Sequence, residues 1–236
     1  MKIVGLQKMT LLDYPGKVAC TIFLGGCNFR CPFCHNSELL DGTAAPVMEM
    51  EELLGFLEKR KGLLDGVCIT GGEPTLQKDL PELLSAIKAM GFAVKLDTNG
   101  YRPEVLKAVV EQGLVDYVAM DVKNCPSRYA ETAGVENLQI SRIEESLVFL
   151  LSGQVDYELR TTVVKPLHDR KAMEEICGWL KNLSPQDMAL RIFIQPFVDR
   201  DTVIFAGLKA PEKAELLDFQ GLLASCAEKV EIRGNS

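Results

Sequence analysis

Short apolar runs rich in β-branched residues alternate with amphipathic stretches along almost the whole chain, and this alternation is the strongest constraint on its fold. It predicts repeated strand–helix units and a sheet of mainly parallel strands. We expect the strands at Val18–Leu24, Gly66–Thr70, Ala93–Asp97, Val115–Met120, Tyr157–Val164 and Met188–Ile194, with short edge strands at Ile3–Gln7 and Val230–Ile232.

Helices are expected between these strands. In Glu49–Lys61, for example, Leu53, Leu54 and Leu57 share one face. About six strand–helix repeats are too few to close the usual eight-stranded barrel. The α/β pattern therefore predicts a partial (β/α)6 barrel or a doubly wound sheet, formed by residues 1–236 as one domain. The other expected helices are Leu80–Met90, Pro103–Gln112, Ser141–Leu151, Arg170–Asn182 and Pro211–Lys229.

The composition is that of an ordinary soluble protein, with 47% apolar and 25% charged residues. No apolar run approaches the roughly 20 residues of a membrane span, and the amino terminus does not look like a signal peptide. We therefore expect a cytoplasmic protein without a membrane partner. The formal charge of −7 argues against a nucleic acid partner, which usually requires a basic surface.

Three of the eight cysteines, Cys27, Cys31 and Cys34, form a C-x3-C-x2-C array directly after the first long strand. Soft thiolates at this density select zinc or an iron–sulfur cluster. Three cysteines would leave one iron of a four-iron cluster free to bind a substrate. The alternative is a zinc site with His35 as the fourth ligand.

A second candidate site element, Gly71-Gly72-Glu73-Pro74, follows the next strand. Glycines allow a small molecule to approach the backbone, and Glu73 supplies an anion suited to an ammonium group. Taken alone, these residues would more often form a tight turn with a solvated acid.

Polar residues also follow the next two strands, as Asp97-Thr98-Asn99-Gly100 and Asp121-Val122-Lys123. The carboxyl ends of parallel strands share one face, which usually carries the chemistry, so these elements should meet the cysteines. Arg160 lies within a later strand. It is either a ligand contact or part of an ion pair inside the barrel.

The cysteine array, with an aromatic residue before its last cysteine, and the following Gly-Gly-Glu-Pro together resemble the radical S-adenosylmethionine (SAM) superfamily. Three further segments, Leu12–Lys17, Cys34–Asn36 and Asp97–Gly100, are similar to those of glycyl-radical-enzyme activases. Within these, residues 5–36 most resemble the activating proteins of anaerobic ribonucleoside-triphosphate reductase.

This resemblance implies a partial (β/α)6 barrel whose cysteines Cys27, Cys31 and Cys34 bind a [4Fe–4S] cluster, with SAM on its fourth iron. It implies that Phe33 lies near the adenine. It also implies that Gly71, Gly72 and Glu73 hold the methionine amino end. Lys123 and Arg160 match charged contacts to the ligand. A monovalent cation beside the carboxylate would be held by Asp97, Thr98 and Asp121.

The activity implied is reductive cleavage of SAM and abstraction of a hydrogen atom from a glycine of a partner glycyl radical enzyme. Flavodoxin or ferredoxin would supply the electron. The chain departs from pyruvate formate-lyase activases in one late strand-end segment, where Gln195 and its neighbours stand in place of a histidine-containing stretch. It also lacks a cysteine-rich insertion, so further clusters are not expected.

The remaining cysteines Cys20, Cys68, Cys177 and Cys226 are expected in the core as reduced thiols. Cys125 and His168 lie in strand-end loops, where an ordinary loop role is favoured for each over a catalytic one. Two alternative functions remain open. One is a radical SAM enzyme that acts on a small molecule such as a modified-nucleoside precursor, and the other is a non-catalytic zinc or redox module.

Overall fold

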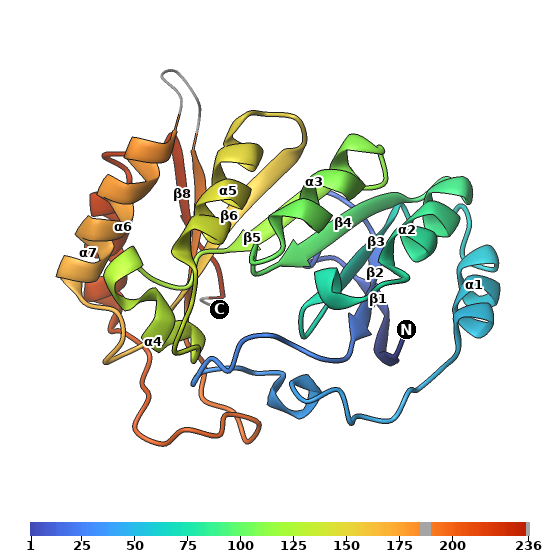
Figure 1. Cartoon of the computed structure of the whole chain (residues 1–236), viewed down its shortest axis with the longest axis horizontal. Helices are drawn as coiled ribbons and strands as arrows, with labels where there is room; N and C mark the ends of the chain where they lie inside the picture. The colour runs from blue at the N-terminus through green and yellow to red at the C-terminus, as the bar shows by residue number, and fades with distance from the viewer. Residues whose placement is uncertain (185–189, 235–236) are drawn as a thin grey trace.

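The computed structural model describes residues 1–184 and 190–234, which form one eight-stranded sheet in the order β1 to β8. All neighbouring strands are parallel except β1, which pairs antiparallel with β2 at one edge. The helices lie around the outside of the curved sheet (Figure 1). The strands are β1 Ile3–Thr10, β2 Ala19–Leu24, β3 Gly66–Gly71, β4 Ala93–Thr98, β5 Tyr117–Asp121, β6 Asp156–Val163, β7 Arg191–Pro196 and β8 Lys229–Ile232.

Most of the helices that connect these strands end within about three residues of the predicted positions, but the helix predicted at Pro211–Lys229 ends earlier, at Leu223. The helices are α1 Met50–Glu58, α2 Leu80–Ala89, α3 Pro103–Glu111, α4 Tyr129–Ala133, α5 Ile140–Leu151, α6 Arg170–Leu183 and α7 Lys213–Leu223. Only the short α4 was not predicted. The partial α/β barrel is confirmed, because the strand order runs from β1 to β8 without a reversal and each strand pairs with its neighbour in sequence. Of the predicted strand Met188–Ile194, residues 188 and 189 lie outside the described residues.

Alternate residues of the parallel strands divide the interior into an apolar and a charged part. Val94 and Leu96 of β4 lie in the main hydrophobic core. Lys95, between them, projects from the opposite face of the strand and is nevertheless 1% exposed. Likewise Leu159 of β6 belongs to the core, whereas the side chain of Arg160 projects from the opposite face of the strand and pairs with Asp121. The inner face of the sheet is therefore lined with ionisable groups.

The cysteines outside the array correct part of the sequence interpretation. Cys20 and Cys68 are buried as predicted. Cys177 of α6 also lies in the core, and Cys226, just after α7, packs against it. These two form a disulfide bond with a Cα–Cα distance of 5.9 Å, so the expectation that they are reduced thiols was wrong. The pair is 49 residues apart in sequence, and only the packing of α6 against α7 brings the two together.

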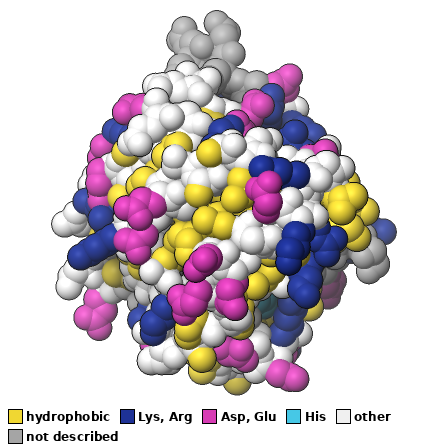
Figure 2. All heavy atoms as spheres, turned by 90° about the vertical axis from the view of Figure 1, so that its right-hand side faces the viewer, with side chains coloured by type: hydrophobic (Ala, Val, Ile, Leu, Met, Phe, Trp, Pro, Cys, Tyr) yellow, Lys and Arg dark blue, Asp and Glu magenta, His cyan; other side chains and the backbone are white. Residues whose placement is uncertain are grey.

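The surface mixes acidic, basic and apolar side chains. Figure 2 views the end of the molecule that carries α1, where hydrophobic side chains lie among charged side chains of both signs. Among the described residues, no helix is both long and apolar enough to cross a bilayer.

Candidate active site

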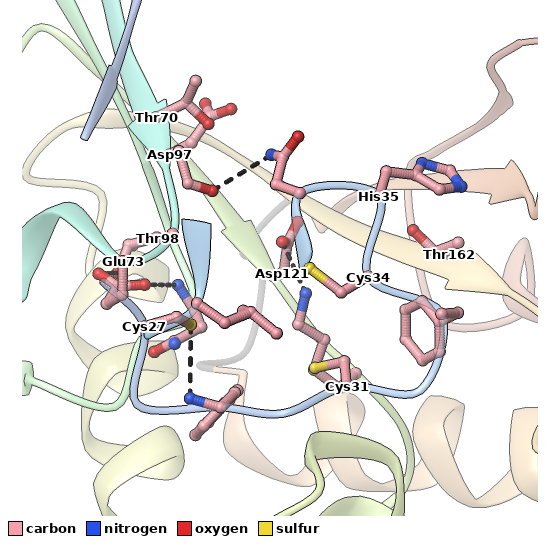
Figure 3. Close-up of a pocket in the computed structure, with 18 of the residues that line it drawn as sticks. Cys27, Cys31, Cys34, His35, Thr70, Glu73, Asp97, Thr98, Asp121 and Thr162 are labelled. Carbon is pink, nitrogen blue, oxygen red and sulfur yellow. Dashed lines mark hydrogen bonds and ion pairs between the residues drawn. The ribbon is translucent and has the colours of Figure 1, made fainter. Parts of the chain in front are cut away.

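A cavity of about 250 Å³ lies at the carboxyl ends of the parallel strands. It is formed where the β2–α1 segment meets the ends of β3 to β7 (Figure 3). Every residue predicted to belong to the site lines this cavity, so the convergence expected from the strand-end rule is confirmed. These residues are Cys27, Cys31, Phe33, Cys34, Gly71, Gly72, Glu73, Asp97, Thr98, Asp121, Lys123 and Arg160.

The cysteine loop is held in place mainly by its backbone. The N–H groups of Gly26 and Cys27 donate to the carbonyl oxygens of Leu39 and Leu40, at 2.7 and 3.0 Å. On the other side, the N–H of Arg30 donates to the carbonyl of Ala133, the last residue of α4, at 2.8 Å. Helix α4 therefore braces the loop, a role that the sequence did not reveal.

Gly134 is what allows α4 to come so close to the loop. It has a φ of +65°, and a Cβ atom added to it would lie 2.3 Å from the carbonyl oxygen of Arg30. A residue with a side chain would be strained by this φ and would collide with the loop backbone.

The three sulfur atoms are spaced around the cavity and do not meet at one point (Figure 3). Among residues 1–184 and 190–234, no three Cys, His, Asp or Glu side chains lie close enough together to hold a single metal ion. A cubane cluster binds each thiolate through a different iron, whereas zinc draws all its ligands to about 2.3 Å from one centre. The arrangement thus fits a cluster better than a zinc ion.

The surroundings of the three thiols favour their protonated form. Burial raises the pKa of Cys27 to about 12 and that of Cys31 to about 11, and it also raises the pKa of Cys34. Without a metal, all three would be neutral at pH 7. Binding a cationic iron–sulfur core deprotonates such thiols and supplies the charge that their surroundings lack.

His35 does not turn toward the cysteines. Its Nε2 lies 2.7 Å from the carbonyl oxygen of Val198, and its ring stacks on Phe197 with 5.7 Å between centroids. Figure 3 shows the ring directed away from Cys34. This arrangement contradicts the alternative in which His35 completes a zinc site.

Glu73 is 1% exposed, and protein groups satisfy both of its carboxylate oxygens. Oε1 accepts hydrogen bonds from the Thr75 hydroxyl at 2.5 Å, the Thr75 N–H at 3.1 Å and the Thr98 hydroxyl at 2.7 Å. Oε2 accepts from the N–H of Asn99 at 2.7 Å. Burial raises the pKa of Glu73, and these hydrogen bonds oppose the rise. Its carboxylate therefore joins the β3 and β4 strand-end loops.

The two glycines before Glu73 bring the β3 strand-end loop against the cysteine loop. Gly71 has a φ of +120°, and a Cβ atom added to it would lie 2.3 Å from the carbonyl oxygen of Leu24. A Cβ atom on Gly72 would lie 2.1 Å from the carbonyl oxygen of Gly26. The N–H of Glu73 donates to that same oxygen at 2.8 Å. Close packing of two loops therefore requires both glycines.

A chain of ion pairs crosses the floor of the cavity. Arg160 donates from Nε to Asp121 at 2.9 Å and from Nη1 to Asp97 at 3.0 Å. Each carboxylate has a second cationic partner: Lys95 pairs with Asp97, and Lys123 lies 2.9 Å from Asp121. Burial alone would raise the pKa values of the two aspartates, but Arg160 and the lysines lower both. Three cationic and two anionic side chains leave one positive charge, which suits a carboxylate ligand.

The structure adds residues that the sequence interpretation did not select. Thr162 of β6 and Gln195 of β7 also line the cavity. No motif marks Thr162, and Gln195 belongs to the late strand-end segment in which the sequence departs from pyruvate formate-lyase activases. His168 is 1% exposed and contacts the carbonyl of Lys123 through Nε2 at 2.9 Å, so it supports the Asp121–Lys123 segment from behind. Cys125 is also buried, which removes the exposure that a reactive role would need.

Comparison with known proteins agrees with this geometry. The family model described as "Radical SAM superfamily" matches residues 21–147, more than half of the chain. The chain belongs to the radical SAM superfamily. Membership implies a [4Fe–4S] cluster and SAM as the cofactors of this enzyme, and the cysteine geometry fits such a cluster.

The radical SAM relatives differ in the reactions that their names describe. A Methanocaldococcus jannaschii protein named "Putative glycyl-radical enzyme activating enzyme" is 33% identical over 239 residues, which cover 98% of this chain and 95% of that protein. A 7-carboxy-7-deazaguanine synthase from Neisseria meningitidis is 34% identical over 128 residues, 54% of each chain. Among solved structures, Streptococcus suis SuiB bound to precursor peptide SuiA matches 91% of this chain and 48% of its own with a TM-score of 0.70 at 16% identity, which shows a shared fold.

Proposed function

We propose that this radical SAM enzyme is a glycyl-radical-enzyme activating enzyme, which removes a hydrogen atom from a backbone glycine of a partner protein. The observation that carries the proposal is the likeness to the M. jannaschii relative, because it extends over nearly the full length of both chains. The likeness to the deazaguanine synthase covers about half of each chain.

The residues of the cavity would divide the work as follows. Cys27, Cys31 and Cys34 hold the cluster, while Gly71, Gly72 and the loop braced by Glu73 hold the amino end of the methionine. Phe33 would lie near the adenine; it is 5% exposed and packs with Val164, Leu167 and Phe197. A reduced cluster bound here supplies the electron that splits SAM into methionine and the radical that takes the glycine hydrogen.

The positive end of the ion-pair chain would receive the methionine carboxylate. Lys123 and Arg160 keep their charge because the burial that would lower their pKa values is outweighed by Asp121 and, for Arg160, also by Asp97. The monovalent cation predicted at Asp97, Thr98 and Asp121 has less support. Both aspartates already pair with basic side chains, and the Thr98 hydroxyl donates to Glu73.

As partner we propose anaerobic ribonucleoside-triphosphate reductase, on the basis of the motifs in residues 5–36, and as reductant flavodoxin or ferredoxin. A second candidate is a radical SAM enzyme with a small-molecule substrate. The likeness to the deazaguanine synthase favours it, as do the polar side chains of Thr162 and Gln195 in the cavity wall. A pyruvate formate-lyase-type activase is the remaining variant of the first proposal.

Anaerobic reconstitution with iron and sulfide, followed by dithionite and SAM, tests the proposal. We expect about four irons per chain and formation of 5′-deoxyadenosine. Adding anaerobic ribonucleotide reductase should then produce a glycyl radical signal in electron paramagnetic resonance. Cleavage of SAM without a glycyl radical on any glycyl radical enzyme would favour the small-molecule alternative.

Cys31→Ala tests the ligand set. It should abolish cluster binding and SAM cleavage while the apo protein stays folded. The matched control is Cys125→Ala, which removes a buried thiol outside the cavity and should retain the full iron content. Full cleavage by Cys31→Ala would refute the assignment.

A further inference from the structure

A short chain of hydrogen bonds leads from the β4 strand-end loop to the cysteine loop. The backbone N–H of Tyr101 donates to Oδ1 of Asn99 at 3.0 Å. The Nδ2 of Asn99 then donates to Oδ1 of Asn28 at 2.9 Å. Asn28 directly follows the cluster ligand Cys27 in the sequence.

These hydrogen bonds can run in only one direction. A backbone N–H can only donate, so the atom of Asn99 that faces Tyr101 must be its oxygen. The amide nitrogen of Asn99 must therefore face Asn28, and the atom of Asn28 that receives it must be an oxygen. The orientations of both side-chain amides therefore follow from one backbone donor, the N–H of Tyr101.

The side-chain Nδ2 of Asn28 is the last donor in this series of hydrogen bonds. This nitrogen is fully buried and has no hydrogen-bond partner among the described residues. A buried amide donor without an acceptor costs about 1–3 kcal/mol, and native proteins rarely leave one so. The unpaired donor therefore indicates that an acceptor belongs beside it.

The neighbouring cluster ligand indicates the kind of acceptor. The protonated Sγ atom of Cys27 donates to Oδ1 of Asn28 at 4.0 Å, and it accepts the backbone N–H of Phe29 at 3.4 Å. When Cys27 binds iron it loses this proton, and its sulfur then acts only as an acceptor. The thiolates and sulfides of an iron–sulfur cluster are sulfur acceptors, and a cluster held by Cys27 brings them to this part of the loop.

We propose that the Nδ2 of Asn28 donates a hydrogen bond to a sulfur atom at the Cys27 corner of the cluster and thereby raises the reduction potential of the cluster. The reduced cluster carries one more negative charge than the oxidised one, so a donor to its sulfur stabilises the reduced form more. Asn28 is a positioning and tuning residue in this scheme. The proposal rests on the cluster of the superfamily and is independent of which substrate the enzyme activates.

The same chain connects the cluster to the ligand-binding loops. The N–H of Asn99 donates to Glu73, whose carboxylate also accepts from Thr75. A shift of the β3 or β4 strand-end loops would therefore move Asn99, and with it the Asn28 amide.

The test is the midpoint potential of the reconstituted cluster, measured by redox titration with electron paramagnetic resonance, alongside iron content. The variant Asn28→Ala removes the donor. The matched control is Asn36→Ala, because that amide lies in the same loop but already donates to the carbonyl of Gly71 at 3.3 Å. Asn28→Leu repeats the test with a side chain of nearly the original size.

We expect the variants of Asn28 to bind about four irons and to be harder to reduce, with the one-electron equilibrium shifted about tenfold, or about 59 mV. The control should keep the wild-type potential. Potentials equal to that of the wild type in Asn28→Ala and Asn28→Leu would overturn the proposal. So would loss of the cluster from both variants, because Asn28 would then serve to form the loop and not to tune the cluster. Failure to generate a glycyl radical on any partner would leave this result unaffected.

Discussion

The Nε atom of Arg160 lies 2.9 Å from Oδ1 of Asp121, across the parallel pair of β6 and β5. Both side chains are largely buried, and Arg160 also holds Asp97. We predict that Arg160→Met lowers the free energy of unfolding by about 1–3 kcal/mol, because each of the two carboxylates loses one hydrogen-bond donor and keeps only its lysine partner.

Urea denaturation of the apo protein measures this effect. Lys107→Met, which breaks an exposed ion pair with Glu145, is the control and should cost less than about 1 kcal/mol. Similar losses of unfolding free energy in the two variants would show that the ion pairs of Arg160 stabilise the fold no more than an exposed pair does.

Gly72→Ala should prevent assembly of the cluster without unfolding the barrel. The added methyl group would lie 2.1 Å from the carbonyl oxygen of Gly26, so the cysteine loop must move. We expect iron content to fall at least twofold while circular dichroism keeps its helical signal. Gly55→Ala in α1 meets no atom within 4 Å and should stabilise the helix by about 1 kcal/mol with normal iron content. Normal iron content in Gly72→Ala would show that the close approach of the loops is not needed.

Glu73→Gln should weaken both stability and SAM binding. The carboxylate accepts hydrogen bonds on both oxygens, and an amide nitrogen at either position would face a donor. The expected loss of stability is about 1–3 kcal/mol. Equilibrium binding of SAM to the reconstituted protein should weaken in parallel, because the β3 and β4 loops separate. Unchanged thermal stability would mean that the carboxylate does not join these loops.

His168 should make the apo protein sensitive to mild acid. Burial lowers its pKa to about 4, whereas an unfolded histidine titrates near 6.5. The neutral ring is therefore favoured in the fold, and its contribution is complete above about pH 6.5 and is lost as the pH falls toward 4.

Between pH 7 and pH 4, the wild type should lose about 3 kcal/mol more stability than His168→Gln, which cannot titrate. Denaturation curves at a series of pH values measure the difference. Parallel losses in the two proteins would assign the acid sensitivity to other groups.

Much of the fold could be predicted because local patterns carry it. The leucine periodicity of α1 and the apolar run of β3 depend on neighbours in sequence, and both elements lie within a few residues of their predicted ends. Helix α4 escaped prediction because its five residues are too few to show a period. The disulfide between Cys177 and Cys226 was missed because nothing in the sequence pairs a residue of α6 with one that follows α7.

The sequence by itself determined which residues meet at the cavity, since parallel strands place their carboxyl ends at one edge whatever the details of packing. Only the tertiary structure decided what each residue does there. Glu73 turned out to bind two loops, and Arg160 turned out to join two aspartates. The physical reason is that a buried polar atom takes whichever partner lies within about 3 Å, and that distance is set by the packing of several strands at once.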